Sequence, residues 1–129
     1  IDVLEARGPV TFLLNFHTGF ELSGAGDQWT GHGDSAALGV RGLLPLGLHW
    51  AQFRQPIRYT DGHVTHELDV LQVSNRDPVQ RKVFVTALRA AESGGDLDMS
   101  NMSAQEEKKY LAITAGEQTF EIGYGGGLV

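Results

Sequence analysis

The nine-residue segment DGHVTHELD, residues 61–69, contains two histidines, a glutamate and two aspartates. Such side chains bind divalent metal ions in proteins. On a strand, His63 and Glu67 would share one face and His66 would project from the other, whereas on a helix all three could converge. We therefore predict His63, His66 and Glu67 as candidate ligands of a divalent metal, with a polar row facing solvent as the alternative. A further ligand would come from another strand: His17, His32 or His49.

A second candidate site is the glycine-rich stretch SGAGDQWTGHGDS, residues 23–35. Its glycines do not fit a dinucleotide-binding loop, because the third glycine of that motif would fall at Trp29. A tryptophan among small polar residues can stack on a sugar ring or an apolar ligand. The predicted binding set for a glycan or small ligand is therefore Trp29, Asp27, His32 and Asp34, with Trp50 and Tyr59 as further aromatic platforms. The alternative is a strand on which Trp29 closes one end of the core between two hairpins.

Composition excludes several classes of partner. Sixteen acidic residues against ten lysines and arginines give a net charge of −6, which leaves no basic surface for nucleic acid or an anionic membrane. The longest nearly apolar run, residues 43–51, is far shorter than the twenty or so residues of a membrane helix. The absence of cysteine excludes disulfides and thiolate ligands. Because the chain starts at Ile1 and not at Met, either a leader was cleaved or the sequence is a fragment, and a secreted or periplasmic location is favoured.

Alternation of apolar and polar residues dominates the chain and predicts an all-β fold. In residues 9–17 the side chains of Val10, Phe12, Leu14 and Phe16 share one face. Similar segments follow at residues 43–53, 57–60, 63–73, 81–90, 110–114 and 119–124, separated by turn sequences. One short helix is expected near residues 103–110, where Ser103 and Glu106 have capping-box spacing. We predict one domain over residues 1–129, an antiparallel sandwich or barrel of about seven to nine strands.

These features favour a non-catalytic β-domain for protein binding or assembly, as a secreted module or a subunit of a larger particle. Exposed apolar strand residues would form its interface, with Leu13, Leu43 and Ile57 as candidates. The expected partner is another protein or a second copy of the chain. Two alternatives stay open: a carbohydrate or small-ligand binder that uses Trp29, and a metal-dependent enzyme centred on His63, His66 and Glu67. No strong catalytic motif supports the enzyme.

Overall fold

The computed structural model describes residues 1–58, 62 and 64–123 as eleven strands joined by turns, with no helix among them. Strand bounds are β1 Asp2–Val10, β2 Leu13–Thr18, β3 Leu22–Ala25, β4 Gln28–His32, β5 Ala36–Leu44, β6 His49–Arg58, β7 Val64–Ser74, β8 Val79–Glu92, β9 Met102–Glu106, β10 Tyr110–Ala115 and β11 Gln118–Gly123. The predicted all-β antiparallel sandwich is confirmed, with more strands than expected.

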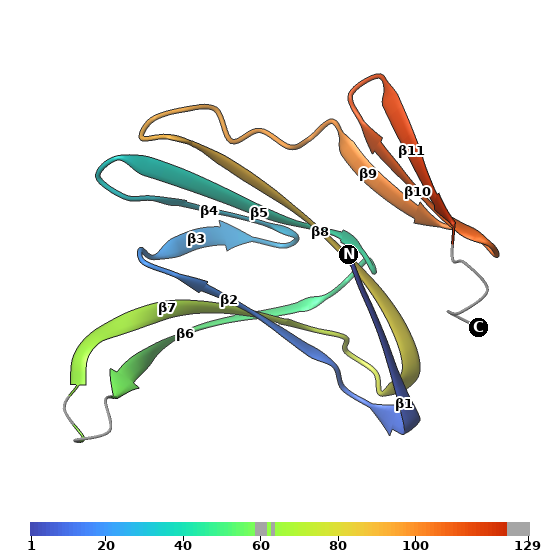
Figure 1. Cartoon of the computed structure of the whole chain (residues 1–129), viewed down its shortest axis with the longest axis horizontal. Coiled ribbons are helices and arrows are strands. Elements are labelled where there is room, and N and C mark those ends of the chain that lie inside the picture. Colours follow the sequence, from blue (N-terminus) through green and yellow to red (C-terminus); the bar gives the residue numbers. More distant parts are fainter. Residues whose placement is uncertain (59–61, 63, 124–129) are drawn as a thin grey trace.

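The strands form three antiparallel sheets (Figure 1). A five-stranded sheet has the order β1-β8-β5-β4-β3, and a three-stranded sheet has the order β2-β7-β6. The third sheet, β11-β10-β9, contains the last three strands and lies on the other side of the five-stranded sheet. The five-stranded sheet is therefore the middle layer, and each of its faces needs apolar side chains.

Alternation along β8 supplies both faces of the middle layer. Phe84 is fully buried against Leu48 and Val73, on the side of the sheet β2-β7-β6. Its neighbours Val83 and Val85 belong to the cluster on the opposite side, which also contains Leu111 of β10. Adjacent strand residues point to opposite faces, so one apolar run can fill two cores.

An arginine joins the outer sheet to the middle layer. Arg41 of β5 donates hydrogen bonds from Nη1 to the carbonyl oxygens of Met99 and Met102, the latter at 3.2 Å. These carbonyls stand at the start of β9, and the side chain of Met99 is fully buried in the same cluster as Leu111. The chain between β8 and β9 is thus held by both packing and charge-assisted hydrogen bonds.

The helix predicted near residues 103–110 is wrong. Residues 103–106 belong to β9, and β10 begins at Tyr110. A two-turn helix is marginal in isolation, whereas β9 pairs with β10 along its length and packs Met102 and Ala104 against the buried cluster of Leu111. Tertiary pairing therefore outweighs the local capping signal.

The single strand predicted over residues 43–53 is also wrong. β5 ends at Leu44, and β6 begins at His49. Between them the chain turns at the cis peptide bond Leu44–Pro45 and at Gly47, whose φ of 71° lies in the left-handed region. Pro45 and Gly47 therefore separate two strands that belong to different sheets.

Candidate functional site

Trp29 lies on β4 and faces the core. Its ring packs in the cluster of Leu22, Val40 and Leu71, and its centroid is 6.3 Å from that of Trp50 at an interplanar angle of 31°. Both indole rings are half-buried, and Nε1 of Trp29 is buried without a hydrogen-bond partner among the described residues. The two tryptophans therefore support the sandwich from within, as the alternative interpretation of this stretch expected.

The glycines around Trp29 serve the β3–β4 hairpin. Gly24 pairs directly with Trp29 across the hairpin, and a Cβ atom at this position would lie 2.2 Å from the carbonyl oxygen of Gln28. Gly26, with a φ of 64°, forms the turn. Close backbone approach and left-handed dihedrals account for these two glycines without a ligand.

The polar members of the predicted ligand set lie apart from one another. The carboxylate of Asp27 is 3.6 Å from Nε of Arg41 and borders, with Trp50, a cavity of about 310 Å³. His32 and Asp34 instead border a separate hollow of about 470 Å³, together with Phe20. Tyr59 lies outside the described residues. The glycan-binding or small-ligand site stays a prediction; Asp27 and Trp50 border one hollow, His32 and Asp34 border the other, and Trp29 lines neither.

The predicted metal ligands are described only in part. His66 and Glu67 are consecutive on β7, so their side chains project to opposite faces of the sheet. Glu67 faces Arg54 of β6 at 3.9 Å. His63 lies outside the described residues, and within residues 1–58, 62 and 64–123 no group of three metal-ligating side chains is found. A metal site that includes His63 stays a prediction.

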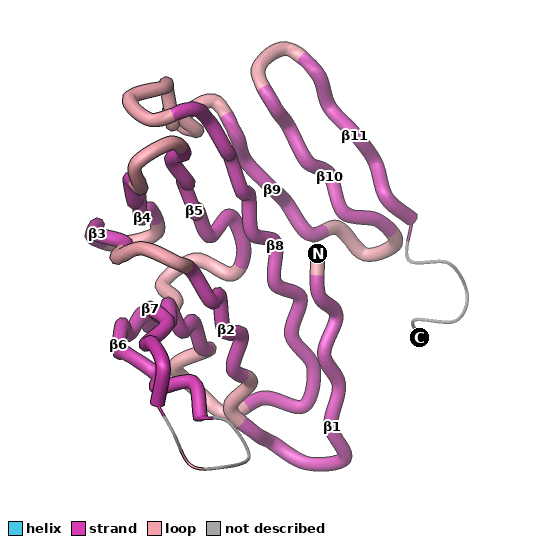
Figure 2. The backbone as a smooth tube through the Cα atoms, turned by 60° about the vertical axis from the view of Figure 1, so that its left-hand side comes forward, coloured by secondary structure: helices cyan, strands magenta, loops and turns pink. Residues whose placement is uncertain are grey.

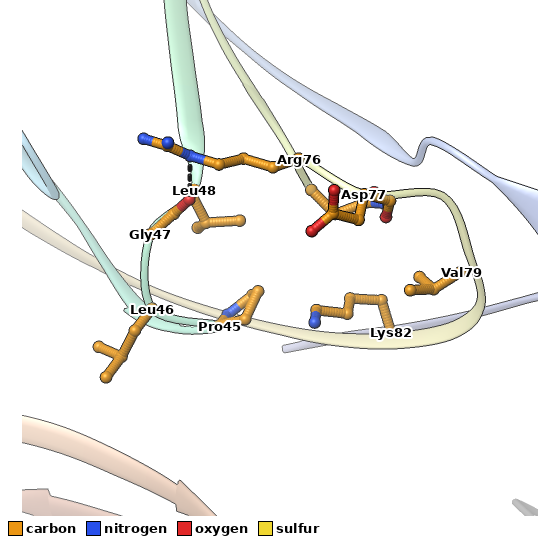
Figure 3. A pocket seen from close by; sticks show the side chains of 9 residues that line it. Pro45, Leu46, Gly47, Leu48, Arg76, Asp77, Val79 and Lys82 are labelled. Carbon is orange, nitrogen blue, oxygen red and sulfur yellow. Dashed lines mark hydrogen bonds between the residues drawn. The ribbon is translucent and has the colours of Figure 1, made fainter.

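A further small cavity of about 190 Å³ lies between the β5–β6 and β7–β8 turns. Figure 3 shows Arg76, Asp77 and Lys82 around it, with the Nε atom of Arg76 donating a hydrogen bond of 2.8 Å to the carbonyl oxygen of Gly47. Asn75 ties the second turn to the β1–β2 connection by accepting a bond of 2.7 Å from the backbone N–H of Phe12. The Arg76 and Asn75 bonds thus join the turns of the sandwich to each other.

Arginine side chains also organise the acidic segment before β9. Nη2 of Arg89 lies 3.0 Å from a carboxylate oxygen of Asp96, and Nη1 of Arg89 bonds the carbonyl of Asp98. Hydrogen bonds from the backbone N–H and hydroxyl of Ser100, with weaker attraction from Arg89 and Arg41, lower the pKa of Asp98. The positive neighbours make this segment a poor place for a cation, and its carboxylates instead order the chain.

The surface least anticipated from sequence is the last strand. All six residues of β11 are exposed, although Phe120 and Ile122 pair directly with Ile113 and Leu111 of β10. Directly opposed residues share a face of the sheet. Leu111 and Ile113 of β10 pack on the middle layer, and Phe120 and Ile122 extend this apolar row onto β11, where no other layer of the described chain covers it. Phe120 is 52% exposed and Ile122 is 43% exposed. Figure 2 shows β11 at the periphery, beyond β9 and β10.

The three interface residues predicted from sequence have different environments. Leu13 of β2 is 54% exposed, Ile57 of β6 is half-buried, and Leu43 of β5 is buried in the cluster under the outer sheet. The prediction for Leu43 is wrong, because β5 lies inside the middle sheet and the outer sheet covers one of its faces.

Comparison of the chain with protein-family models, with curated proteins and with solved structures gave no match. Among the described residues there is also no helix of the length and apolarity needed to cross a membrane.

Proposed function

We propose that this chain is a non-catalytic β-domain that assembles with other protein chains through β11. The proposal rests on one observation, the uncovered apolar row of Phe120 and Ile122 on an outermost strand. Water-exposed aromatic and β-branched side chains side by side on a strand gain free energy when a partner covers them. We call the exposed row of Phe120 and Ile122, together with the outer backbone edge of β11, the β11 surface.

Three of the other outer strands, β1, β6 and β3, carry features that discourage edge-to-edge association. β1 contains Pro9 and a register shift between Glu5 and Val10. β6 contains Pro56 and the charged side chain of Arg54, and β3 is only four residues long. Prolines, charges, bulges and short length are the usual means by which proteins protect sheet edges. β11 has no proline and one charged residue, Glu121, and so lacks most of this protection.

The arrangement of the polar residues supports binding over catalysis. Catalytic groups must converge on one reacting centre, within hydrogen-bond reach of it. In the described part of the chain, Asp27 borders a different hollow from His32 and Asp34, and Glu67 projects away from His66. Domains that work by association need no such convergence.

The test is the mass of the whole chain in solution, measured by light scattering over a range of concentrations. We expect the wild type to exceed its monomer mass of 14.0 kDa as concentration rises. The double variant Phe120→Thr, Ile122→Thr places threonine, which has a high strand propensity, at both positions and should stay at the monomer mass.

The matched control for this test is Leu13→Thr on β2, which removes an equally exposed leucine from a different outer strand. It should associate like the wild type. A wild type that stays monomeric at every concentration, or a double variant that associates unchanged, would overturn the proposed function.

A further inference from the structure

The β10–β11 hairpin determines which backbone groups of β11 are available to a partner. Its turn consists of Gly116, with a φ of 61°, and Glu117, so Ala115 and Gln118 flank a two-residue loop. In such a hairpin the flanking pair exchanges hydrogen bonds, and the pairs then alternate along the ladder. Gln118, Phe120 and Ile122 therefore direct their N–H and C=O groups toward β10.

The alternate residues of β11 direct theirs outward. Thr119, Glu121 and Gly123 present backbone donors and acceptors at the outer edge, where no described strand pairs with them. Unpaired groups along a full strand form a template for one more antiparallel strand. The partner at this edge must then be an extended strand whose own backbone N–H and C=O groups are free at every second residue.

We infer that the occupant is β11 of a second copy, paired antiparallel about a twofold axis that passes beside Phe120. This inference rests on the proposed function and specifies its partner. In this register Phe120 lies opposite Phe120 of the other copy at a non-hydrogen-bonded pair, where side chains approach most closely. Thr119 lies opposite Glu121, and both residues have their backbone groups directed outward. The two outer sheets join into one continuous sheet of six strands.

Charge selects this register over its neighbour. A shift that centres the axis on Glu121 would oppose two carboxylates directly, which is unfavourable in a sheet. With the axis at Phe120, each Glu121 carboxylate instead faces a threonine hydroxyl, and the Thr119 hydroxyl already lies 3.1 Å from that of Thr114. β11 is therefore more complementary to itself with the axis at Phe120 than with the axis at Glu121.

The ends of the strand favour the same partner. With the axis at Phe120, Glu117 in the turn of one copy lies opposite Gly123 of the other. Gly123 pairs with Tyr110, and Tyr110 directly follows Lys108 and Lys109 in the β9–β10 turn. Glu117 of one copy is thus brought toward Lys108 and Lys109 of the other, in a turn that also contains Glu107, twice by symmetry. Isologous contacts of this type close into a dimer and do not propagate into fibres.

The chain contains no cysteine, so single cysteine variants report the register without interference. Under mild oxidation, Phe120→Cys should form a disulfide-linked dimer by itself. Thr119→Cys and Glu121→Cys should each remain uncrosslinked alone, yet crosslink to one another when mixed. The mixture keeps Phe120 in place, so it tests the register even if loss of this ring weakens association. Leu13→Cys on β2 is the control for random collision and should give only background crosslinking.

The outcomes separate the inference from the proposed function. Crosslinking of Glu121→Cys by itself, with none for Phe120→Cys, would overturn the inferred register. A wild type that dimerises while no β11 variant crosslinks above the Leu13→Cys background would overturn the pairing of β11, although the proposed assembly would stand if Phe120→Thr, Ile122→Thr still abolished it. A wild type that never exceeds the monomer mass would overturn both.

Discussion

Replacement of Arg41 by methionine should loosen the outer sheet from the middle layer. Arg41 is 21% exposed at its side chain and donates to the carbonyl oxygens of Met99 and Met102. A hydrogen bond from a charged donor contributes about 1.5–3 kcal/mol. The Met99 carbonyl retains a second bond of 3.0 Å from the N–H of Met102, so it does not become unpaired. Methionine also preserves the apolar stem. We therefore expect a loss of about 2–3 kcal/mol in the free energy of unfolding.

The matched control is Arg54→Met. Arg54 approaches three carboxylates, those of Glu21, Glu67 and Asp69, at 3.4–3.9 Å, but its side chain is 62% exposed. Ion pairs of such exposure contribute about 0–1 kcal/mol despite their number. Both variants remove one positive charge, but Arg41 is largely buried and Arg54 is exposed. A count of ion pairs alone would predict the larger loss of stability for Arg54→Met, which is opposite to our expectation.

Urea unfolding followed by tryptophan fluorescence measures the difference, because Trp29 and Trp50 both pack in the core. With a urea dependence of about 1–3 kcal/mol per molar, Arg41→Met should lower the midpoint by roughly 1–2 M. Arg54→Met should leave the midpoint nearly unchanged. If Arg54→Met is as destabilising as Arg41→Met, or if Arg41→Met is neutral, then burial and bonding to carbonyl groups do not explain how the outer sheet is held.

Two further predictions concern the hairpin and the acidic segment. Gly24→Ala should destabilise the fold by about 1–3 kcal/mol, because its methyl group would overlap the backbone of Gln28; Gly8→Ala, with open space around it, is the control, and equal urea midpoints would contradict the argument. Asp98 has a lowered pKa in the fold, so it contributes stability above its unfolded pKa near 3.8 that is lost as pH falls through the lower folded value. Unfolding free energies measured from about pH 5 downward should therefore fall less steeply in Asp98→Asn than in the wild type, and parallel curves would refute the role of Ser100 and Arg89.

Local alternation predicted much of this fold, because each strand needs a buried face. Residues 81–90 and 110–114 lie within β8 and β10. Phe12, Leu14 and Phe16 pack on one cluster as expected, whereas Val10, predicted on the same face, ends β1 in a different sheet. The segment 63–73, predicted as a strand, is a strand from Val64 onward. In these segments the local pattern and the tertiary environment favour the same conformation.

The failures have a common physical cause, which is contact between segments that are distant in sequence. Ser103 and Glu106 carry a helical signal within four residues, but β9 packs on a buried cluster that includes Leu43 of β5 and Val83 of β8. Trp29 has small polar neighbours that suggest exposure, yet its core contact is Trp50 on another sheet. Burial of Leu43 likewise depends on the outer sheet. None of these partners can be identified from a window of the sequence.

The candidate site depends on the same long-range information. The segment 119–124 alternates like a half-buried strand, and β11 occupies most of it. The sequence cannot indicate that β11 is an outer strand of its sheet. Its apolar side chains therefore have no other sheet to pack against in the described part of the chain. An exposed surface of this kind is defined by strand order, and its residue types alone resemble those of any buried strand.

Strand β11 also differs from the rest of the fold in the balance of its folding free energy. Fixing the backbone of one residue costs about 1–2 kcal/mol in conformational entropy, and burial of apolar surface is the main term that offsets this cost. β10 meets this requirement through Leu111, which is 1% exposed, whereas none of the six residues of β11 is buried. Pairing β11 with β11 of a second copy would place Phe120 beside Phe120 and Ile122 beside Gln118, which would reduce the exposure of both apolar side chains and satisfy the outer backbone groups in one step. The proposed pairing of β11 with a second copy would therefore account for an ordered strand with exposed aromatic and aliphatic side chains.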